Sequence, residues 1–248
     1  MYYNTRARFT ETDYKFIIET LTAAEEDRTA IRQLTADPEM LSELLHHDKL
    51  FDRATSIPPI FLSISPHMFF YLFVYRALVS KNLANDDVVD YIAGICIEFR
   101  SSHNLWQFSS KDEKMVYSVD LLNMLGDVDK HQQYYLRRYI GNVTLFLTGF
   151  FPDYIFQRSK KKGAPPLEYY EKLGRTQFET AASDSLNYDI ETAPVLNTLA
   201  ERFVDIRSAL NIYTDAYLHL NSKKHSLEII ERQVATLDEE SFRQSLEL

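Results

Sequence analysis

A run of apolar residues three and four positions apart dominates the C-terminal part of the chain. It comprises Leu196, Leu199, Phe203, Ile206, Leu210, Tyr213, Tyr217 and Leu220. Such spacing places the apolar side chains on one face of an α-helix and the intervening polar residues on the other. The pattern predicts one long C-terminal helix, whose apolar seam needs a partner either elsewhere in this chain or on a second copy.

Helix start signals divide most of the remaining sequence into shorter helices. Asp37, Ser65 and Asn85 each precede a proline or an acidic residue, and their side-chain oxygens can accept hydrogen bonds from the first amides of a helix. We expect helices over residues 12–34, from 38, over 66–79, from 85, over 117–150 with a break near Gly126, and over 167–186, with Pro152 ending the 117–150 run.

The sequence lacks the features typical of β-sheet. Only six glycines and eight prolines occur, and no alternation of apolar and polar residues is bounded by turn dipeptides. The 248 residues can bury a substantial core, and the single cysteine, Cys96, excludes an intramolecular disulfide. We therefore predict an all-α, multi-helix bundle of about 8 to 10 helices. It would form a single domain over residues 1–248, with a long heptad-patterned helix at its C-terminal end.

Charge and hydropathy argue against nucleic acid and membranes as partners. The formal net charge of −9 disfavours attraction to phosphates. The apolar stretch 60–79 is long enough to cross a bilayer, but it contains Pro66, His67 and Arg76, so we interpret it as a buried helix. The polar start of the chain does not resemble a secretory signal, and we expect a cytoplasmic protein. The basic run 158–162 fits a solvated loop tip or an anion contact.

One aspartate string matches a known magnesium motif. Asp86, Asp87 and Asp90 form the DDxxD pattern with which helical prenyl-diphosphate and terpene synthases hold magnesium. Here the string follows Asn85 at a predicted helix start, where acidic residues are expected from the helix dipole alone. We therefore favour a role at the helix terminus over a metal site.

Histidine spacings offer weaker metal candidates. Glu43 and His46 have the Glu-x-x-His spacing of carboxylate di-iron bundles, which need a second copy of the motif that this chain lacks. Two further pairs at i, i+4 are Asp127 with His131 and Asp215 with His219. Imidazole and carboxylate ligands in these pairs would suit zinc or iron, but such pairs are also ordinary helix-surface contacts.

Four glycines fall inside predicted helices, where each costs about 1 kcal/mol relative to alanine. They are Gly94, Gly141, Gly149 and Gly174, and Tyr170 lies one turn before the last of them. Either two helices cross closely at these positions, or the missing side chains leave room for a flat ligand. Charged residues embedded in aromatic sequence add four candidate ligand-binding residues, which are His67, Arg76, Arg138 and Arg175.

No nucleophile elbow or phosphate-binding glycine loop is present in the sequence. We therefore expect a protein that acts by binding, through homodimerisation or a protein partner. The predicted interface is the C-terminal seam residues Leu199, Phe203, Ile206, Leu210 and Tyr213. The alternative is a helical-bundle enzyme or carrier that encloses a metal, a cofactor or an aromatic small molecule.

Overall fold

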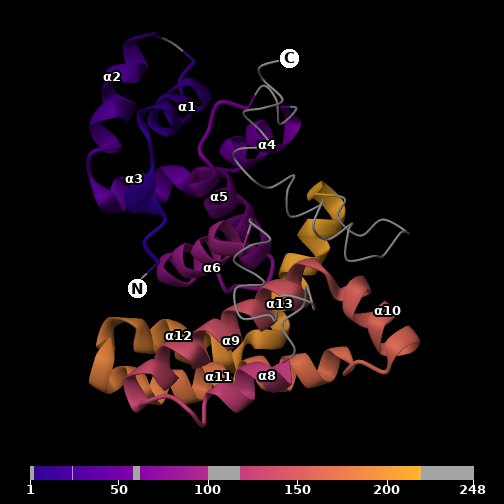
Figure 1. Ribbon diagram of the computed structural model, residues 1–248. Coiled ribbons are helices and arrows are strands. Elements are labelled where there is room, and N and C mark those ends of the chain that lie inside the picture. Colours follow the sequence, from indigo (N-terminus) through magenta and orange to yellow (C-terminus); the bar gives the residue numbers. More distant parts are fainter. Residues whose placement is uncertain (1–2, 24, 58–61, 100–117, 219–248) are drawn as a thin grey trace, which may run out of the picture. The chain divides into compact units, whose positions relative to one another are not determined.

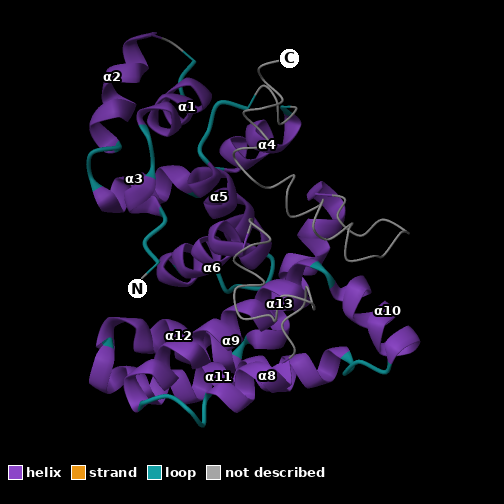
Figure 2. Cartoon of the chain, in the orientation of Figure 1, coloured by secondary structure: helices purple, strands orange, loops and turns teal. Residues whose placement is uncertain are grey.

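A computed structural model describes residues 3–23, 25–57, 62–99 and 118–218 (Figure 1). Within these ranges the regular structure is entirely helical, with twelve α-helices and no strand (Figure 2). The prediction of an all-α protein is confirmed. The number of helices in the described residues exceeds the predicted 8 to 10. Two of the expected long helices are each divided in two, and the helix Asp48–Ser56 has no counterpart among the expected ones.

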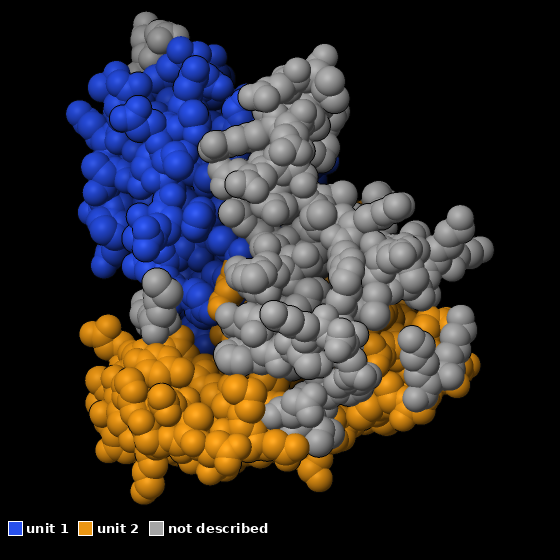
Figure 3. Space-filling view, in the orientation of Figure 1, with its two compact units in different colours: residues 1, 3–97, 239–248 blue, residues 2, 98–238 orange. Residues whose placement is uncertain are grey.

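The chain forms two compact units (Figure 3). Unit 1 contains the described residues from 3 to 97, and unit 2 contains those from 98 to 218. The single domain over residues 1–248 stays a prediction.

Unit 1 contains five whole helices, a short 3-10 turn and all but the last two residues of a sixth helix. They are η1 (Arg6–Arg8), α1 (Glu11–Leu21), α2 (Glu25–Leu34), α3 (Pro38–Leu45), α4 (Asp48–Ser56), α5 (Pro66–Val79) and α6 (Asp86–Phe99). The expected single helix over 12–34 is wrong. Thr22 adopts an extended backbone and its hydroxyl donates to the carbonyl of Ile18 at 2.7 Å, which ends α1.

The predicted helix starts in unit 1 are confirmed. The Asp37 carboxylate accepts hydrogen bonds from the amides of Glu39 and Met40, and the Ser65 hydroxyl accepts one from the amide of Met68. Most side chains of α5 are buried, as expected for the apolar stretch. Among the described residues, no helix combines the length and the apolar content that a bilayer crossing requires.

Unit 2 is built around one long buried helix. Its elements are α8 (Ser118–Met124), α9 (Lys130–Phe150), α10 (Pro152–Lys162), α11 (Leu167–Tyr188), η3 (Ile190–Thr192), α12 (Ala193–Glu201), α13 (Phe203–Tyr213) and the π-helical turn η4 (Thr214–Leu218). Every residue from 138 to 150 on α9 is buried. The break near Gly126 is confirmed, whereas Pro152 stands in the first turn of α10 and so begins a helix rather than only ending one.

The single long C-terminal helix is not what the structure shows. Arg202 leaves the helical conformation and divides the expected helix into α12 and α13, and residues 219–248 lie outside the described ranges. The apolar period continues across the bend, so the sequence gives no sign of it. Four of the predicted interface residues are fully buried within unit 2, namely Leu199, Phe203, Ile206 and Leu210. The fifth, Tyr213, is half-buried. An interface with a partner would therefore need residues other than the four buried ones.

Glycines allow the helices of unit 2 to approach closely. A Cβ atom placed on Gly141 of α9 would lie 2.7 Å from the ring of Phe178 on α11. One placed on Gly174 of α11 would overlap the ring of Phe203 on α13. The approach at Gly149 is looser, since a Cβ there would lie 3.1 Å from the side chain of Leu210. The space beside all three glycines is filled by neighbouring side chains, as the helix-crossing alternative requires.

We expect Gly174→Ala to lower the free energy of unfolding by about 1–2 kcal/mol. The new methyl group would overlap the buried Phe203 ring, and overpacking of this kind outweighs the helix propensity gained. Gly126→Ala is the matched control, because a Cβ there meets only the Asn123 carbonyl oxygen at 3.5 Å. Urea unfolding followed by circular dichroism measures both. Equal or greater stability of Gly174→Ala would show that the crossing is not tight.

Candidate functional site

The strongest polar cluster in unit 1 gathers at the first turn of α6. Asn85 precedes this helix, and its side-chain oxygen accepts hydrogen bonds from the amides of Asp87 at 3.0 Å and Val88 at 3.3 Å. Because Asn85 already caps the helix, the carboxylate of Asp86 is available for partners from other elements.

Four side chains from three other elements donate hydrogen bonds to the Asp86 carboxylate. The donors are the Arg6 guanidinium (2.9 Å), the His46 Nε2 atom (2.9 Å), the Tyr71 hydroxyl (3.1 Å) and the Ser42 hydroxyl. Arg6 comes from η1, Ser42 from α3, His46 from the position directly after α3, and Tyr71 from α5. We call these five residues, together with Asp90, the Asp86 centre.

Asp90 lies one turn further along α6 and shares the same arginine. Its side chain is 2% exposed and accepts hydrogen bonds from the Arg6 amide at 3.0 Å and from Arg6 Nε at 2.8 Å. Two carboxylates of the DDxxD string therefore face one guanidinium, while Asp87 is exposed. A guanidinium therefore occupies the place that a magnesium ion would need. Asp86 and Asp90 connect α6 to another element of the fold, which goes beyond the expected role at the helix terminus.

The two carboxylates of the centre differ in acidity. Burial favours a higher pKa for Asp86, but hydrogen bonds from Ser42 and His46 and the charge of Arg6 outweigh burial and hold the pKa below its ordinary value. Burial dominates at Asp90 and raises its pKa to about 6, although Arg6 opposes the shift. Burial and the charge of Asp86 raise the pKa of Tyr71, which remains a neutral donor.

The Asp86 centre contains a serine, a histidine and an aspartate without the geometry of a catalytic triad. In a triad the two imidazole nitrogens separate the serine from the carboxylate. Here Ser42 donates directly to Asp86, and the same Nε2 atom of His46 lies 2.9 Å from Asp86 and 3.4 Å from the Ser42 hydroxyl. The serine proton is directed to a carboxylate, so this arrangement holds helices together rather than activating a nucleophile.

The weak metal candidates are not brought together with further ligands. Glu43 is exposed, whereas His46 faces Asp86 and stacks on Tyr75 with ring centroids 4.1 Å apart. His131 contacts aromatic rings, and His219 lies outside the described residues. In the part of the chain that the structure describes, no group of three or more His, Cys, Asp or Glu side chains could hold a metal ion.

The predicted ligand-binding residues are distributed over both units. His67 and the Arg76–Asp48 ion pair belong to unit 1. The other candidates belong to unit 2, where Tyr170 is half-buried and Arg175 is exposed. Arg138 is buried and donates to the Tyr134 hydroxyl at 3.3 Å and to Asp189 at 3.4 Å. Neighbouring side chains fill the space beside Gly141, Gly149 and Gly174, and a common ligand site formed by the candidate residues stays a prediction.

A second cluster, which the sequence analysis missed, lies where α9 begins and α11 ends. His131, Tyr135 and Tyr188 are exposed rings arranged around the buried Tyr134. Each ring contacts two others, with centroids between 4.9 and 5.6 Å apart. We call these four rings the tyrosine face. The four-residue spacing of His131 and Tyr135 is a signal for a shared helix surface, but it does not reveal Tyr188.

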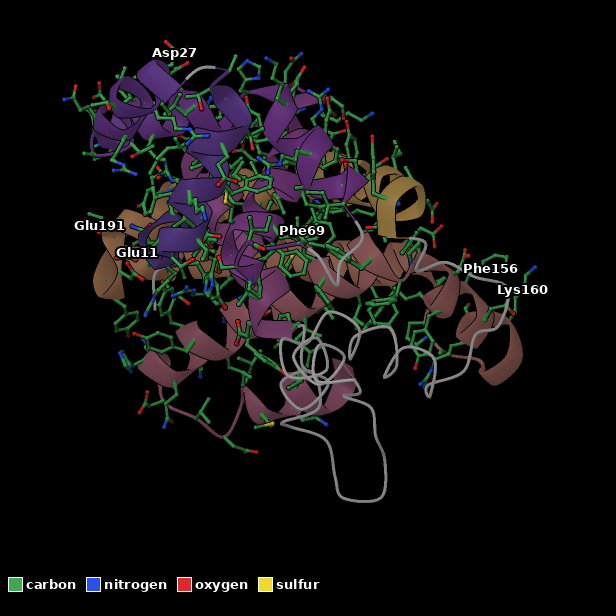
Figure 4. The ribbon with its side chains drawn as sticks, turned by 90° about the horizontal axis from the view of Figure 1, so that it is seen from above. Glu11, Asp27, Phe69, Phe156, Lys160 and Glu191 are labelled. Atoms are coloured by element: carbon green, nitrogen blue, oxygen red, sulfur yellow. The ribbon has the colours of Figure 1, made fainter. Side chains whose placement is uncertain are left out.

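The basic run expected as a loop tip is the end of a helix. α10 extends to Lys162 and ends at Gly163, whose positive φ of 62° suits glycine. On this helix the Lys160 ammonium lies 4.3 Å from the centre of the Phe156 ring, and both side chains project from α10 (Figure 4). The lysine is therefore engaged with a ring of its own helix.

Comparisons of the chain with protein-family models, with curated proteins and with solved structures find no match.

We expect Asp86→Asn to lower the free energy of unfolding by about 2 kcal/mol at pH 7, because charge-assisted hydrogen bonds are lost. The pKa of Asp86 is lowered in the folded chain. The stability that the Asp86 carboxylate contributes to the folded chain is therefore complete above its unfolded pKa of about 4. This contribution is lost as the pH falls through its folded pKa. The difference between wild type and variant should accordingly shrink at pH 3.

Asp87→Asn serves as the control for this prediction, since the Asp87 side chain is exposed on the same turn. Its effect should stay within about 0.5 kcal/mol. Urea unfolding at pH 7 and pH 3 measures both variants. Equal losses in the two variants would contradict the role assigned to Asp86.

Proposed function

We propose that this chain acts by binding a segment of another protein, and that the tyrosine face of unit 2 is the contact surface. The observation that supports this most strongly is the exposure of its rings. Tyr135 is 41% exposed and Tyr188 is 38% exposed, although both lie in a cluster with a fully buried tyrosine. Tyrosine is enriched at protein interfaces because its ring is large and rigid and its hydroxyl remains able to form hydrogen bonds.

The rings are held in place before any partner arrives. The buried Tyr134 ring packs against the rings of both Tyr135 and Tyr188. The Arg138 guanidinium donates hydrogen bonds to the Tyr134 hydroxyl and to the Asp189 carboxylate. The Arg138 guanidinium also lies 5.4 Å from the centre of the Tyr134 ring. A surface that is already ordered loses less conformational entropy on association, which favours binding.

Two exposed aliphatic residues flank Tyr188 in the sequence. Leu186 is 64% exposed and Ile190 is 66% exposed. A different protein suits this surface better than a second copy, because the net charge of −9 opposes self-association.

The test uses a photo-crosslinking amino acid in place of Tyr188, with Ile212 as the matched control position. Ile212 is also exposed, at 55%, and belongs to α13 of the same unit. We expect position 188, but not position 212, to capture one specific protein. That protein, once purified, should bind the wild-type chain in isothermal titration calorimetry.

The double variant Tyr135→Ala/Tyr188→Ala should then weaken binding of the purified partner at least about tenfold, because both exposed rings are removed. Val204→Ala/Ile212→Ala, which removes two exposed apolar residues elsewhere in unit 2, should leave Kd unchanged. Equal binding by the two double variants would contradict the proposal. Capture of a second copy of this chain at position 188 would contradict the proposal of a different protein as the partner and would indicate self-association instead.

A further inference from the structure

The part of the chain that precedes α1 lies along α6, and we call residues 3–9 the strap. Its backbone forms only the 3-10 turn η1, and extended residues at Phe9 and Thr10 join it to α1. Of its residues only Thr5 is buried, and the Thr5 hydroxyl donates to the backbone carbonyl of Asp90 at 2.9 Å instead of capping η1. The strap is therefore fixed mainly by what it contacts, as a bound peptide is.

Aromatic contacts hold the strap at both of its ends. The Tyr3 ring packs edge-on against Tyr91 of α6, with centroids 4.9 Å apart, and the Phe9 ring packs edge-on against Tyr71 of α5 at 6.0 Å. Gly94 of α6 makes room for Tyr3, because a Cβ at this position would overlap the tyrosine ring. A glycine inside a helix lowers its helix propensity, so the notch at Gly94 is explained by the ring that it receives.

Arg6 provides the charged contact in the middle of the strap. Its guanidinium lies 2.9 Å from Asp86 and 2.8 Å from Asp90, and its amide donates to the other carboxylate oxygen of Asp90 at 3.0 Å. The guanidinium also lies 5.7 Å from the centre of the Tyr71 ring. Among the described residues, no other lysine or arginine pairs with these two carboxylates. Arg8, in contrast, is exposed.

The surface under the strap requires a positively charged occupant. Asp86 and Asp90 lie one turn apart on α6, and two carboxylates at this spacing repel each other when no cation lies between them. Asp90 is 2% exposed beneath the strap, and a carboxylate in such a position needs a positive partner. Any segment that replaces the strap must therefore bring a cation, and the notch at Gly94 adds a place for a ring. We call this surface the strap site; it consists of Tyr71, Asp86, Asp90, Tyr91 and Gly94.

The strap can leave this site while the rest of unit 1 stays folded. The Asp13 carboxylate accepts a hydrogen bond from the Thr10 amide at 2.7 Å, so the start of α1 is stabilised independently of the strap. Release breaks the contacts of four strap residues, namely Tyr3, Thr5, Arg6 and Phe9. Segments with few buried residues open at a lower free-energy cost than the whole domain.

We propose that the strap site is a peptide-binding surface, for which the strap is the resident ligand and a basic segment of another protein is the second ligand. The segment carries an arginine three residues after an aromatic residue, which is the spacing of Arg6 and Tyr3. It competes with the strap and releases it. Charge complementarity favours a basic partner over a second copy of this chain, whose net charge is −9. This surface belongs to unit 1 and is independent of the tyrosine face.

A peptide titration of the full chain tests the proposal. The double variant Tyr3→Ala/Arg6→Ala weakens the resident strap, and the added peptide is Tyr-Asn-Thr-Arg-Ala-Arg-Phe, the sequence of residues 3–9. The peptide is titrated to about 10 mM, above the effective concentration of roughly 1 mM that a tethered segment has. Amide signals of residues 86–94 are followed by NMR. We expect saturable shifts in the double variant and a Kd at least about tenfold higher for the wild-type chain, whose own strap competes.

Two altered peptides of equal charge provide the matched control. Alanine in place of the arginine that corresponds to Arg6 should raise Kd at least about tenfold, because charge-assisted hydrogen bonds to two carboxylates are lost. Alanine in place of the arginine that corresponds to Arg8 should change Kd by less than about twofold, since Arg8 is exposed. Equal Kd values for the two altered peptides, or no shifts with the unaltered one, would overturn the proposal.

Two further measurements complete the test. Should Tyr3→Ala/Arg6→Ala not fold, the single variant Arg6→Ala is titrated with the same three peptides, and the same outcomes decide. Native mass spectrometry of the wild-type chain identifies the alternative occupant. We expect a monomer, whereas a dimer that dissociates when the peptide is added would assign the strap site to a second copy and contradict a different protein as the ligand.

Discussion

The close approach of helices around α9 is the constraint on which unit 2 depends. Gly141 admits the ring of Phe178 from α11, and Gly174 on that helix admits the ring of Phe203 from α13. Each glycine loses helix propensity, but it lets a large aromatic side chain be fully buried, and the gain from burial is larger. The same packing explains why the apolar seam of α12 and α13 is not available to a partner. Its residues fill the space that the glycines leave.

Unit 1 depends on polar contacts between its helices, because several polar side chains meet at one carboxylate. One carboxylate, Asp86, accepts hydrogen bonds from η1, α3 and α5, and its neighbour Asp90 holds the same arginine. Such a network specifies one arrangement of helices, since any other leaves donors or charges without partners.

Local signals explain which parts of the fold were predictable from the sequence. The starts of α3, α5 and α6 were correct because capping uses residues two or three positions apart, as at Asp37, Ser65 and Asn85. The bends at Thr22 and Arg202 were not, since neither contains glycine or proline and the apolar period passes through the second bend unchanged. Periodicity shows which face of a helix is apolar, but not whether the helix is continuous.

The candidate sites were harder to predict, because their members are far apart in the sequence. Asp86 was recognised as part of the DDxxD string at a helix start, whereas Arg6 and His46 reach it across 80 and 40 residues. The tyrosine face joins Tyr135 to Tyr188 in the same way, through contacts that only the packing of α9 against α11 creates. The glycine stripe, in contrast, was visible in the sequence, and its two interpretations could be separated only by the rings that occupy the space. Both clusters therefore depend on buried helix packing, and their polar and aromatic groups lie where that packing ends.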